Sequence, residues 1–302
     1  MHIPDGFLTA PVWGACQVLA LPAVAWSARR AQAGSTETNV PLLGALGAFV
    51  FAAQMINFPV AGGASGHLVG SALLAASVGP WAASVVMAAI LTLQAFVFQD
   101  GGLLALGANL FNMALVGVWA AWVPLRLAAH GRRRRIALAA AGFFSVFTAA
   151  LCALVELALS GVRLPAATVW VALGVFALTA MIEGILTVAV YEAIERINPR
   201  WVQAPAPLTR RAGAGLAAAA VALAGAGFLI ASSLPDGLDH LAETAGFASL
   251  ERPVAGAPLA DYEALFVANP WLSKALAGLA GLALTSLLCY LLGRWINRWR
   301  SA

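Results

Sequence analysis

Charged residues are scarce in this sequence, and lysine is almost absent. Only 10% of the 302 residues are Asp, Glu, Lys or Arg, whereas 62% are hydrophobic. Soluble globular domains carry about 25% charged residues, because their surfaces must be solvated. The one lysine, Lys274, lies in Pro-Trp-Leu-Ser-Lys-Ala, so the Gly-x-x-x-x-Gly-Lys-Ser/Thr loop that binds nucleotide phosphates is missing. These absences exclude a soluble protein and ATP hydrolysis by this chain.

Cysteine is also rare, with three residues in the whole chain. Cys16, Cys152 and Cys289 are far apart, and each lies in an apolar stretch. That placement is typical of small buried hydrophobic residues, and it favours neither a disulfide framework nor a thiolate metal site.

Long apolar runs make up most of the chain, and they divide into nine segments at charges, prolines and glycine clusters. A helix needs about 20 apolar residues to cross the hydrocarbon core of a bilayer. The sequence therefore predicts an all-α polytopic membrane protein, a helical bundle of about nine segments. Segment 66–79 is short for a crossing, and a half-helix or a re-entrant segment is the alternative there. The nine segments are residues 11–28, 41–58, 66–79, 81–98, 103–125, 136–159, 166–194, 212–232 and 271–293.

Basic residues are distributed unevenly between the loops, which predicts an orientation. With nine crossings and the N-terminus outside, the inner side receives 14 of the 17 basic residues. Because cytoplasmic loops are enriched in Lys and Arg, we expect the N-terminus outside and the C-terminus in the cytoplasm. The inner residues are Arg29, Arg30, Arg126, Arg132, Arg133, Arg134, Arg135, Arg196, Arg200, Arg210, Arg211, Arg294, Arg298 and Arg300.

Acidic residues gather on the opposite, outer side. There they either attract cations by their summed charge or simply solvate the loops, and the sequence leaves both readings open. The residues are Asp5, Asp100, Asp236, Asp239, Glu243, Glu251, Asp261 and Glu263.

The first two residues form a potential chelate. Because His2 is large, Met1 is expected to be retained and to present a free amino group. The Met1 amino nitrogen, the His2 backbone nitrogen and His2 Nδ1 can hold one ion through fused five- and six-membered rings. Square-planar nitrogen coordination suits Ni²⁺ and Cu²⁺, and imidazole is a ligand for both. Metal binding must compete with protonation of the amine and of the imidazole.

His67 offers a fourth ligand at the outer mouth of segment 66–79. It follows Gly-Gly-Ala-Ser-Gly, and these small residues let backbones approach closely. Glu183 lies in the middle of segment 166–194, where a carboxylate is costly, and it could gate the path, pair with a buried polar group or dock a partner helix. His240 is a candidate metal relay in the outer loop. Side chains that could orient the ligands are Asp5, Gln54, Asn57, Ser65 and Gln94.

The residues quoted so far resemble the CbiM/NikM proteins, the substrate-binding (S) components of energy-coupling-factor importers for cobalt and nickel. The resemblance is carried by Met-His-Ile-Pro-Asp-Gly-Phe-Leu at 1–8, by residues 54–60 and 63–68, and by 94–113 with its Asp-Gly-Gly at 100–102. It implies that Met1, His2 and His67 hold Ni²⁺ or Co²⁺, which is the transported substrate. Gln99 and Ala64 depart from the glycine and threonine expected at those positions.

A second resemblance covers the C-terminal third. Pro-Asp-Gly-Leu-Asp at 235–239 is similar to the signature of PDGLE domains, with Asp239 in place of the usual glutamate. The two resemblances imply a metal-binding membrane domain at 1–205 and a PDGLE (NikN/CbiN-like) domain at 206–302, with two transmembrane helices and an extracytoplasmic loop.

Partners and location also come from the resemblance. It implies a separate transmembrane coupling subunit, two ATPase subunits and membrane lipid as partners, with no nucleic acid, in the bacterial cytoplasmic (inner) membrane. The chain itself is then a transporter subunit and not an enzyme. Two alternatives remain at this stage: a secondary metal transporter that works without ATPases, and a membrane metalloenzyme, which would need an open metal position and a nearby base.

The absence of a nucleotide-binding loop gives a first testable prediction. Reconstituted alone into vesicles, the chain should bind Ni²⁺ or Co²⁺ without accumulating it, whether or not ATP is supplied, because nothing in it can use ATP. Uptake of a radioactive metal isotope measures this directly, with protein-free vesicles as the control. Accumulation driven by an ion gradient in the purified chain would instead indicate the secondary transporter.

Overall fold

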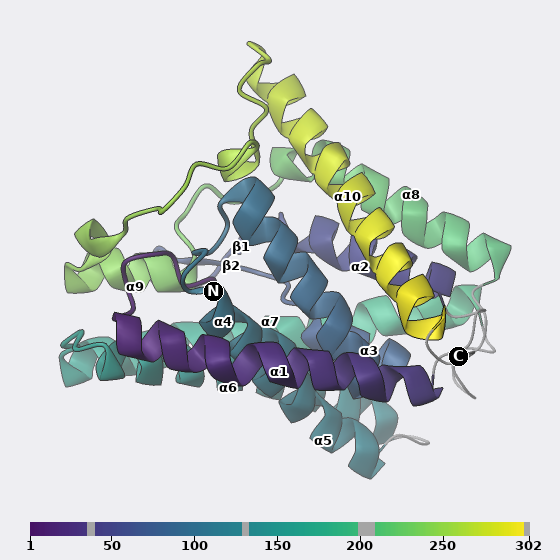
Figure 1. Cartoon of the computed structure of the whole chain (residues 1–302), viewed down its shortest axis with the longest axis horizontal. Coiled ribbons are helices and arrows are strands. Elements are labelled where there is room, and N and C mark those ends of the chain that lie inside the picture. Colours follow the sequence, from purple (N-terminus) through teal and green to yellow (C-terminus); the bar gives the residue numbers. More distant parts are fainter. Residues whose placement is uncertain (35–39, 129–132, 199–208, 299–302) are drawn as a thin grey trace.

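The computed structural model describes residues 1–34, 40–128, 133–198 and 209–298, and it confirms the predicted all-α class (Figure 1). One two-stranded hairpin, β1 (Asn57–Pro59) and β2 (Ser65–His67), interrupts the helices. Short π-helical stretches at Gln94–Phe98 and Leu110–Gly117 continue α3 and α4. The helices are α1 (Ala10–Gly34), α2 (Val40–Gln54), α3 (Ser71–Leu93), α4 (Leu106–Asn109), α5 (Val118–Ala128), α6 (Arg134–Leu159), α7 (Ala166–Ile197), α8 (Arg210–Ala226), α9 (Gly237–Ala245) and α10 (Pro270–Arg298).

Seven helical stretches in the described residues are long and apolar enough to cross a membrane. The apolar α2 is shorter, with 15 residues. The predicted segments 66–79 and 81–98 fall together in one of these stretches, Ser71–Phe98. Each of the remaining stretches overlaps one predicted segment. The seven stretches are Ala10–Gln32, Ser71–Phe98, Leu106–Ala128, Arg134–Leu159, Ala166–Ile197, Arg210–Leu229 and Pro270–Ile296.

Helix α3 is not straight, because the chain reverses direction near its middle. Gln54 Nε2 donates to the Val69 carbonyl at 2.6 Å and lies 3.7 Å from Met87 Sδ. In a straight helix the 18 residues between positions 69 and 87 would span about 27 Å, too far for one amide group to touch both. The turn is at Gly79, whose φ of 78° and ψ of 165° are not helical, followed by Pro80.

The first arm of this hairpin is too short to cross a bilayer as a helix. It covers Ser71–Gly79, a rise of about 13 Å. The prediction began this segment at residue 66, but residues 65–67 form β2 instead. Likewise, the predicted segment 41–58 corresponds to α2, which already ends at Gln54. Residues 57–59 form β1 and pair with β2 instead.

The hairpin of α3 occupies the centre of the bundle, in contact with α1, α2, α5, α6, α7 and α10. Helices α2, α8 and α10 pack on one another at one side, and α5, α6 and α7 form the other (Figure 1). Gly142 of α6 lies against Gly184 of α7 so closely that a Cβ on either would overlap the partner backbone. Small residues permit this approach between membrane helices.

The amino terminus lies beside β1, β2 and α9, whereas the C-terminal end of α10 lies at the right of the view (Figure 1). Helix α9 follows Pro235, in the part predicted as an outer loop. The orientation across the membrane stays a prediction. The expected domain boundary at 205 and 206, and the arginines Arg132, Arg200 and Arg300, lie outside the described residues.

The turn inside α3 predicts a stability effect at Gly79. Its φ and ψ fall in a region that is essentially restricted to glycine. Gly79→Ala should therefore destabilise the protein by about 1–3 kcal/mol, although nothing lies within 4 Å of the added methyl group. Thermal unfolding in detergent measures the loss. Gly14→Ala, a helical position that is equally open, is the matched control and should leave the midpoint unchanged or raise it.

Candidate metal centre

Hydrogen bonds of two side chains, those of Asn109 and Asp5, anchor the first five residues. Asn109 holds the Ile3 backbone through two hydrogen bonds, accepting from its N–H at 2.8 Å and donating to its carbonyl at 3.0 Å. The Asp5 carboxylate accepts from three successive backbone N–H groups, those of residues 103, 104 and 105, at 2.8–3.2 Å. These groups lie in the loop that ends at Ala105, the residue directly before α4. The chain end is thereby fixed in place.

Two glycines make room for this segment. A Cβ on Gly102 would overlap the backbone and carboxylate of Asp5, and one on Gly101 would press against Asn109 and His2. Gly101 also has a φ of 92°, which favours glycine. Asp-Gly-Gly at 100–102 therefore works as a cradle for the N-terminus.

The anchored chain end brings the Met1 amino group to His67. The Met1 nitrogen lies 3.2 Å from His67 Nε2 and forms an ion pair with the Asp236 carboxylate. Asp236 Oδ2 lies 4.0 Å from the same imidazole nitrogen. Burial opposes ionisation of Asp236, but the charge of the amino terminus outweighs it and lowers the pKa of this carboxyl group.

His67 presents Nε2 as an acceptor to the Met1 amino group. Its Nδ1 lies 3.1 Å from the Leu68 carbonyl, which can only accept, so Nδ1 carries the proton and Nε2 keeps its lone pair. Burial, the amino terminus and His2 lower the pKa of His67 to about 4, so the imidazole is neutral at pH 7. Pairing of His67 with Asn57 between β2 and β1 fixes its backbone.

His2 lies parallel to His67, with ring centroids 5.6 Å apart and an interplanar angle of 5°. It is 7% exposed. Its Nδ1 pairs with Asp100 Oδ1 at 2.9 Å, and its Nε2 is buried with no hydrogen-bond partner in the part of the chain that the structure describes. Among the described residues, none accepts a hydrogen bond from the His2 backbone N–H. Burial opposes ionisation of Asp100, but His2 and Tyr262 lower the pKa of its carboxyl group well below the usual range.

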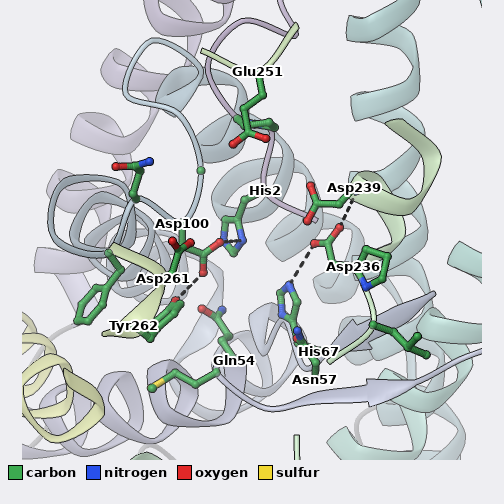
Figure 2. A pocket seen from close by; sticks show the side chains of 17 residues that line it. His2, Gln54, Asn57, His67, Asp100, Asp236, Asp239, Glu251, Asp261 and Tyr262 are labelled. Carbon is green, nitrogen blue, oxygen red and sulfur yellow. Dashed lines mark hydrogen bonds and ion pairs between the residues drawn. The ribbon is translucent and has the colours of Figure 1, made fainter. Parts of the chain in front are cut away.

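These groups surround a cavity of about 420 Å³ (Figure 2). Five of its 17 lining residues are carboxylates, and none is Lys or Arg. Such a hollow concentrates cations. The carboxylates are Asp100, Asp236, Asp239, Glu251 and Asp261. Within the described part of the chain, no three His, Cys, Asp or Glu side chains are arranged to hold one metal ion.

The residues that were predicted to orient the metal ligands do not all lie at the cavity. Gln54 and Asn57 line the cavity, and Gln94 donates to Gln54 Oε1 at 2.8 Å. Ser65 is fully buried and instead fixes the C-terminal part, because its Oγ donates to the Leu234 carbonyl at 2.7 Å. Asp5 anchors the chain end, as described above.

Glu183 and His240 lie outside the lining of this cavity. The buried Glu183 carboxylate accepts from the N–H groups of Val69 and Gly70 at 2.8 Å each, directly after His67 and before α3. It therefore fixes the backbone that follows the histidine. The proposed coupling role of Glu183 and the relay role of His240 stay predictions.

Three residues of the site had no assigned role in the sequence. Asp100 and Asp236 appeared only among the outer acids and within quoted stretches, and Tyr262 gave no signal. Tyr262 donates its hydroxyl proton to Asp100 Oδ2. Only the folded chain places it there, since 162 residues separate the two.

The chain matches known families along most of its length. Residues 2–201 match the family model described as CbiM, cobalt uptake substrate-specific transmembrane region, and residues 210–298 match the PDGLE domain. The fold and site thus define a multi-pass, substrate-specific membrane component of transition-metal uptake, which is not an enzyme. The chain belongs to the CbiM family and carries a fused PDGLE domain.

Individual relatives share this two-part organisation. A protein of Archaeoglobus fulgidus that carries the name of a fused nickel transport protein, NikMN, is 34% identical, with 98% of this chain and 99% of that protein covered. The fused nickel transport protein NikMN of Rhodobacter capsulatus is 32% identical, with 94% of each covered. The crystal structure of a truncated transition-metal transporter is 29% identical and superposes with a TM-score of 0.56, covering 65% of this chain and 99% of that one.

The glycine cradle predicts that metal binding depends on Gly102. Gly102→Ala should weaken Ni²⁺ and Co²⁺ binding by at least about tenfold, since displacing Asp5 releases a chain end whose ordering must then be supplied on binding. Calorimetry on the purified chain measures the affinities. Gly174→Ala, which meets nothing within 4 Å, is the control; equal binding by both variants would show that the cradle is dispensable.

Proposed function

We propose that this chain captures Ni²⁺ or Co²⁺ through a chelate of four nitrogens. They are the Met1 amino nitrogen, the His2 backbone nitrogen, His2 Nδ1 and His67 Nε2. The first three belong to consecutive groups and close two fused rings around the ion, and His67 completes a square. Nitrogen ligands in a square suit Ni²⁺.

The 3.2 Å separation between the Met1 nitrogen and His67 Nε2 carries this proposal. Two groups that are 66 residues apart meet in a buried hollow, and both are nitrogen donors. The parallel His2 ring lies beside them, and the Leu68 carbonyl already directs the His67 lone pair. Outer partners that fix the tautomer and orientation of a metal-binding histidine are usual in metal sites.

The ion pair between the Met1 amino group and Asp236 supports a cation-binding site at this position. The ammonium group neutralises a buried carboxylate before a metal ion binds, and binding must remove protons from the amine and the amide. The carboxylate then remains to balance the charge of the ion. Since a bound divalent ion that has replaced one amide proton keeps a net positive charge, nearby carboxylates stabilise it.

We favour nickel slightly over cobalt, because Ni²⁺ more readily displaces an amide proton in a square-planar site. The family relationship supports partners of the energy-coupling-factor type: a transmembrane coupling subunit and two ATPase subunits whose cycle would release the ion inward. In this arrangement the cavity faces the outside, and the membrane is the cytoplasmic membrane.

The terminal chelate is tested by extending the chain by several residues ahead of Met1, since a single added residue would place His2 third in the chain, where a new amine, two backbone nitrogens and the imidazole form another square-planar site for Ni²⁺. The extension turns the primary amine into an amide and should abolish tight binding of Ni²⁺ and Co²⁺, a loss of at least about a thousandfold. Calorimetry should compare the extended chain with the native N-terminus. A version whose extra residues a protease removes is the matched control and should regain binding.

Unchanged affinity in the extended chain would remove the amine from the site. The metal would then have to bind among His67 and the carboxylates of the cavity. Thermal unfolding of the extended chain without metal checks that the loss of binding is not a loss of folding.

A further inference from the structure

One face of α7 packs against the two segments that carry the partners of the amino-terminal nitrogen. Those partners are the imidazole of His67 and the carboxylate of Asp236. Phe176, Thr179 and Glu183 of α7 are spaced by three and four residues, so their side chains share one face of the helix. All three are buried. This face of α7 therefore supports the metal centre on both sides.

Two of these side chains contact glycines that lie next to the partners. Gly237 directly follows Asp236, and a Cβ there would be 2.9 Å from the Phe176 ring. Gly66 directly precedes the histidine, and a Cβ there would be 2.7 Å from Thr179 Cγ2. Each contact exists only because the glycine has no side chain. The strand that carries the histidine thus lies directly against α7.

Glu183 holds the chain on the other side of the histidine. Its Oε2 accepts from the Val69 N–H and its Oε1 from the Gly70 N–H, each at 2.8 Å. Two neighbouring N–H donors need two acceptor oxygens, which a carboxylate provides, whereas the amide of glutamine has one oxygen and an NH2 donor. In the part of the chain that the structure describes, no Lys or Arg side chain pairs with Glu183. These two N–H groups explain why a costly carboxylate is present in an apolar helix.

The junction that Glu183 holds has little freedom of its own. Gln54 donates to the Val69 carbonyl at 2.6 Å. Gly70 has a φ of 80°, and a Cβ there would be 2.6 Å from Val50 Cγ1. A displacement of this junction is therefore passed along the chain to His67, two residues before Val69.

The position of His67 matters because its nitrogen must share an ion with the amino terminus. Nitrogen ligands lie about 2 Å from a bound ion, so two of them at adjacent corners of a square are about 3 Å apart. The Met1 nitrogen and His67 Nε2 are 3.2 Å apart. The contacts of α7 thus keep the imidazole at a distance that suits a shared metal ion.

We propose that Glu183 is a positioning residue for metal binding, which acts through His67. It touches neither the ion nor a ligand atom, and it fixes the imaginary line of approach only through the backbone of residues 69 and 70. The proposal rests on the terminal chelate and extends the metal site to the buried face of α7.

The test is Glu183→Gln in the full chain with its native N-terminus. The change keeps the size of the side chain and places an NH2 group opposite a backbone N–H, so one hydrogen bond is lost. We expect the Ni²⁺ affinity, measured by calorimetry, to fall about tenfold. Thr187→Val is the matched control. It lies one turn further along α7, is fully buried and has no hydrogen-bond partner among the described residues, so the affinity should not change.

A second pair of measurements shows whether the effect passes through the histidine. His67→Ala removes one of the four proposed ligands and should weaken Ni²⁺ binding. Adding Glu183→Gln to that variant should cause no further loss, because no imidazole is left to position. Effects of independent sites add, whereas those of a dependent pair do not.

Gly66→Ala tests the contact before the histidine and leaves Glu183 unaltered. The added methyl group would lie 2.7 Å from Thr179 Cγ2 and 3.1 Å from Thr179 Oγ1. It should push the strand away from α7 and lower the Ni²⁺ affinity. Adding Thr179→Ala removes both of these atoms and should restore the affinity. This pair tests the proposal even where Glu183→Gln does not fold, which thermal unfolding without metal checks.

The outcomes separate this proposal from the one it rests on. Unchanged affinity in folded Glu183→Gln overturns the role of Glu183. An equal loss with and without His67 also overturns it, because Glu183 would then only support the fold. Failure of Thr179→Ala to rescue Gly66→Ala overturns positioning by α7. All three results leave the chelate standing, whereas a His67→Ala chain that binds Ni²⁺ as tightly as the unaltered chain overturns both proposals.

Discussion

The structure around the site depends on one constraint, which is that the amino-terminal end of the chain is held immobile beside His67. Chain ends are ordinarily the least ordered part of a protein, and ordering one on binding weakens affinity. Here Asn109 binds both polar groups of the Ile3 backbone, and Asp5 accepts three hydrogen bonds from the loop directly before α4. Hydrogen bonds to a charged group contribute about 1.5–3 kcal/mol each. The amino group is thus positioned before any metal arrives.

The C-terminal domain takes part in the same site. Ser65 and Pro235 join β2 to the segment before α9, Asp236 pairs with Met1, and the Arg252 N–H donates to the Asp5 carbonyl at 2.8 Å. Tyr262 reaches Asp100 from the same domain. The cavity is therefore built by two sequence regions that match two separate family models, and neither region alone supplies all of its lining.

Irregular backbone at the centre of the bundle needs partners, because unsatisfied polar groups are costly away from water. In the turn between β2 and α3, side chains supply these partners. Gln54 donates to the Val69 carbonyl, and Glu183 accepts from the N–H groups of Val69 and Gly70. The carboxylate of Glu183 sits at the N-terminus of the first arm of α3, where the helix dipole favours negative charge. The strand that carries His67 is thereby tied to α7.

The sequence by itself determined the membrane class, the apolar segments and the residues able to chelate a metal, because each depends on composition or on neighbours along the chain. The proposed chelate of Met1 and His2 is local, and the helices follow from apolar length. Only the tertiary structure decided that α3 folds back at Gly79, that β2 replaces the start of a helix, and that Asp100, Asp236 and Tyr262 meet at the site. These features arise from contacts between distant residues, such as Tyr262 with Asp100, and no periodicity or spacing encodes them.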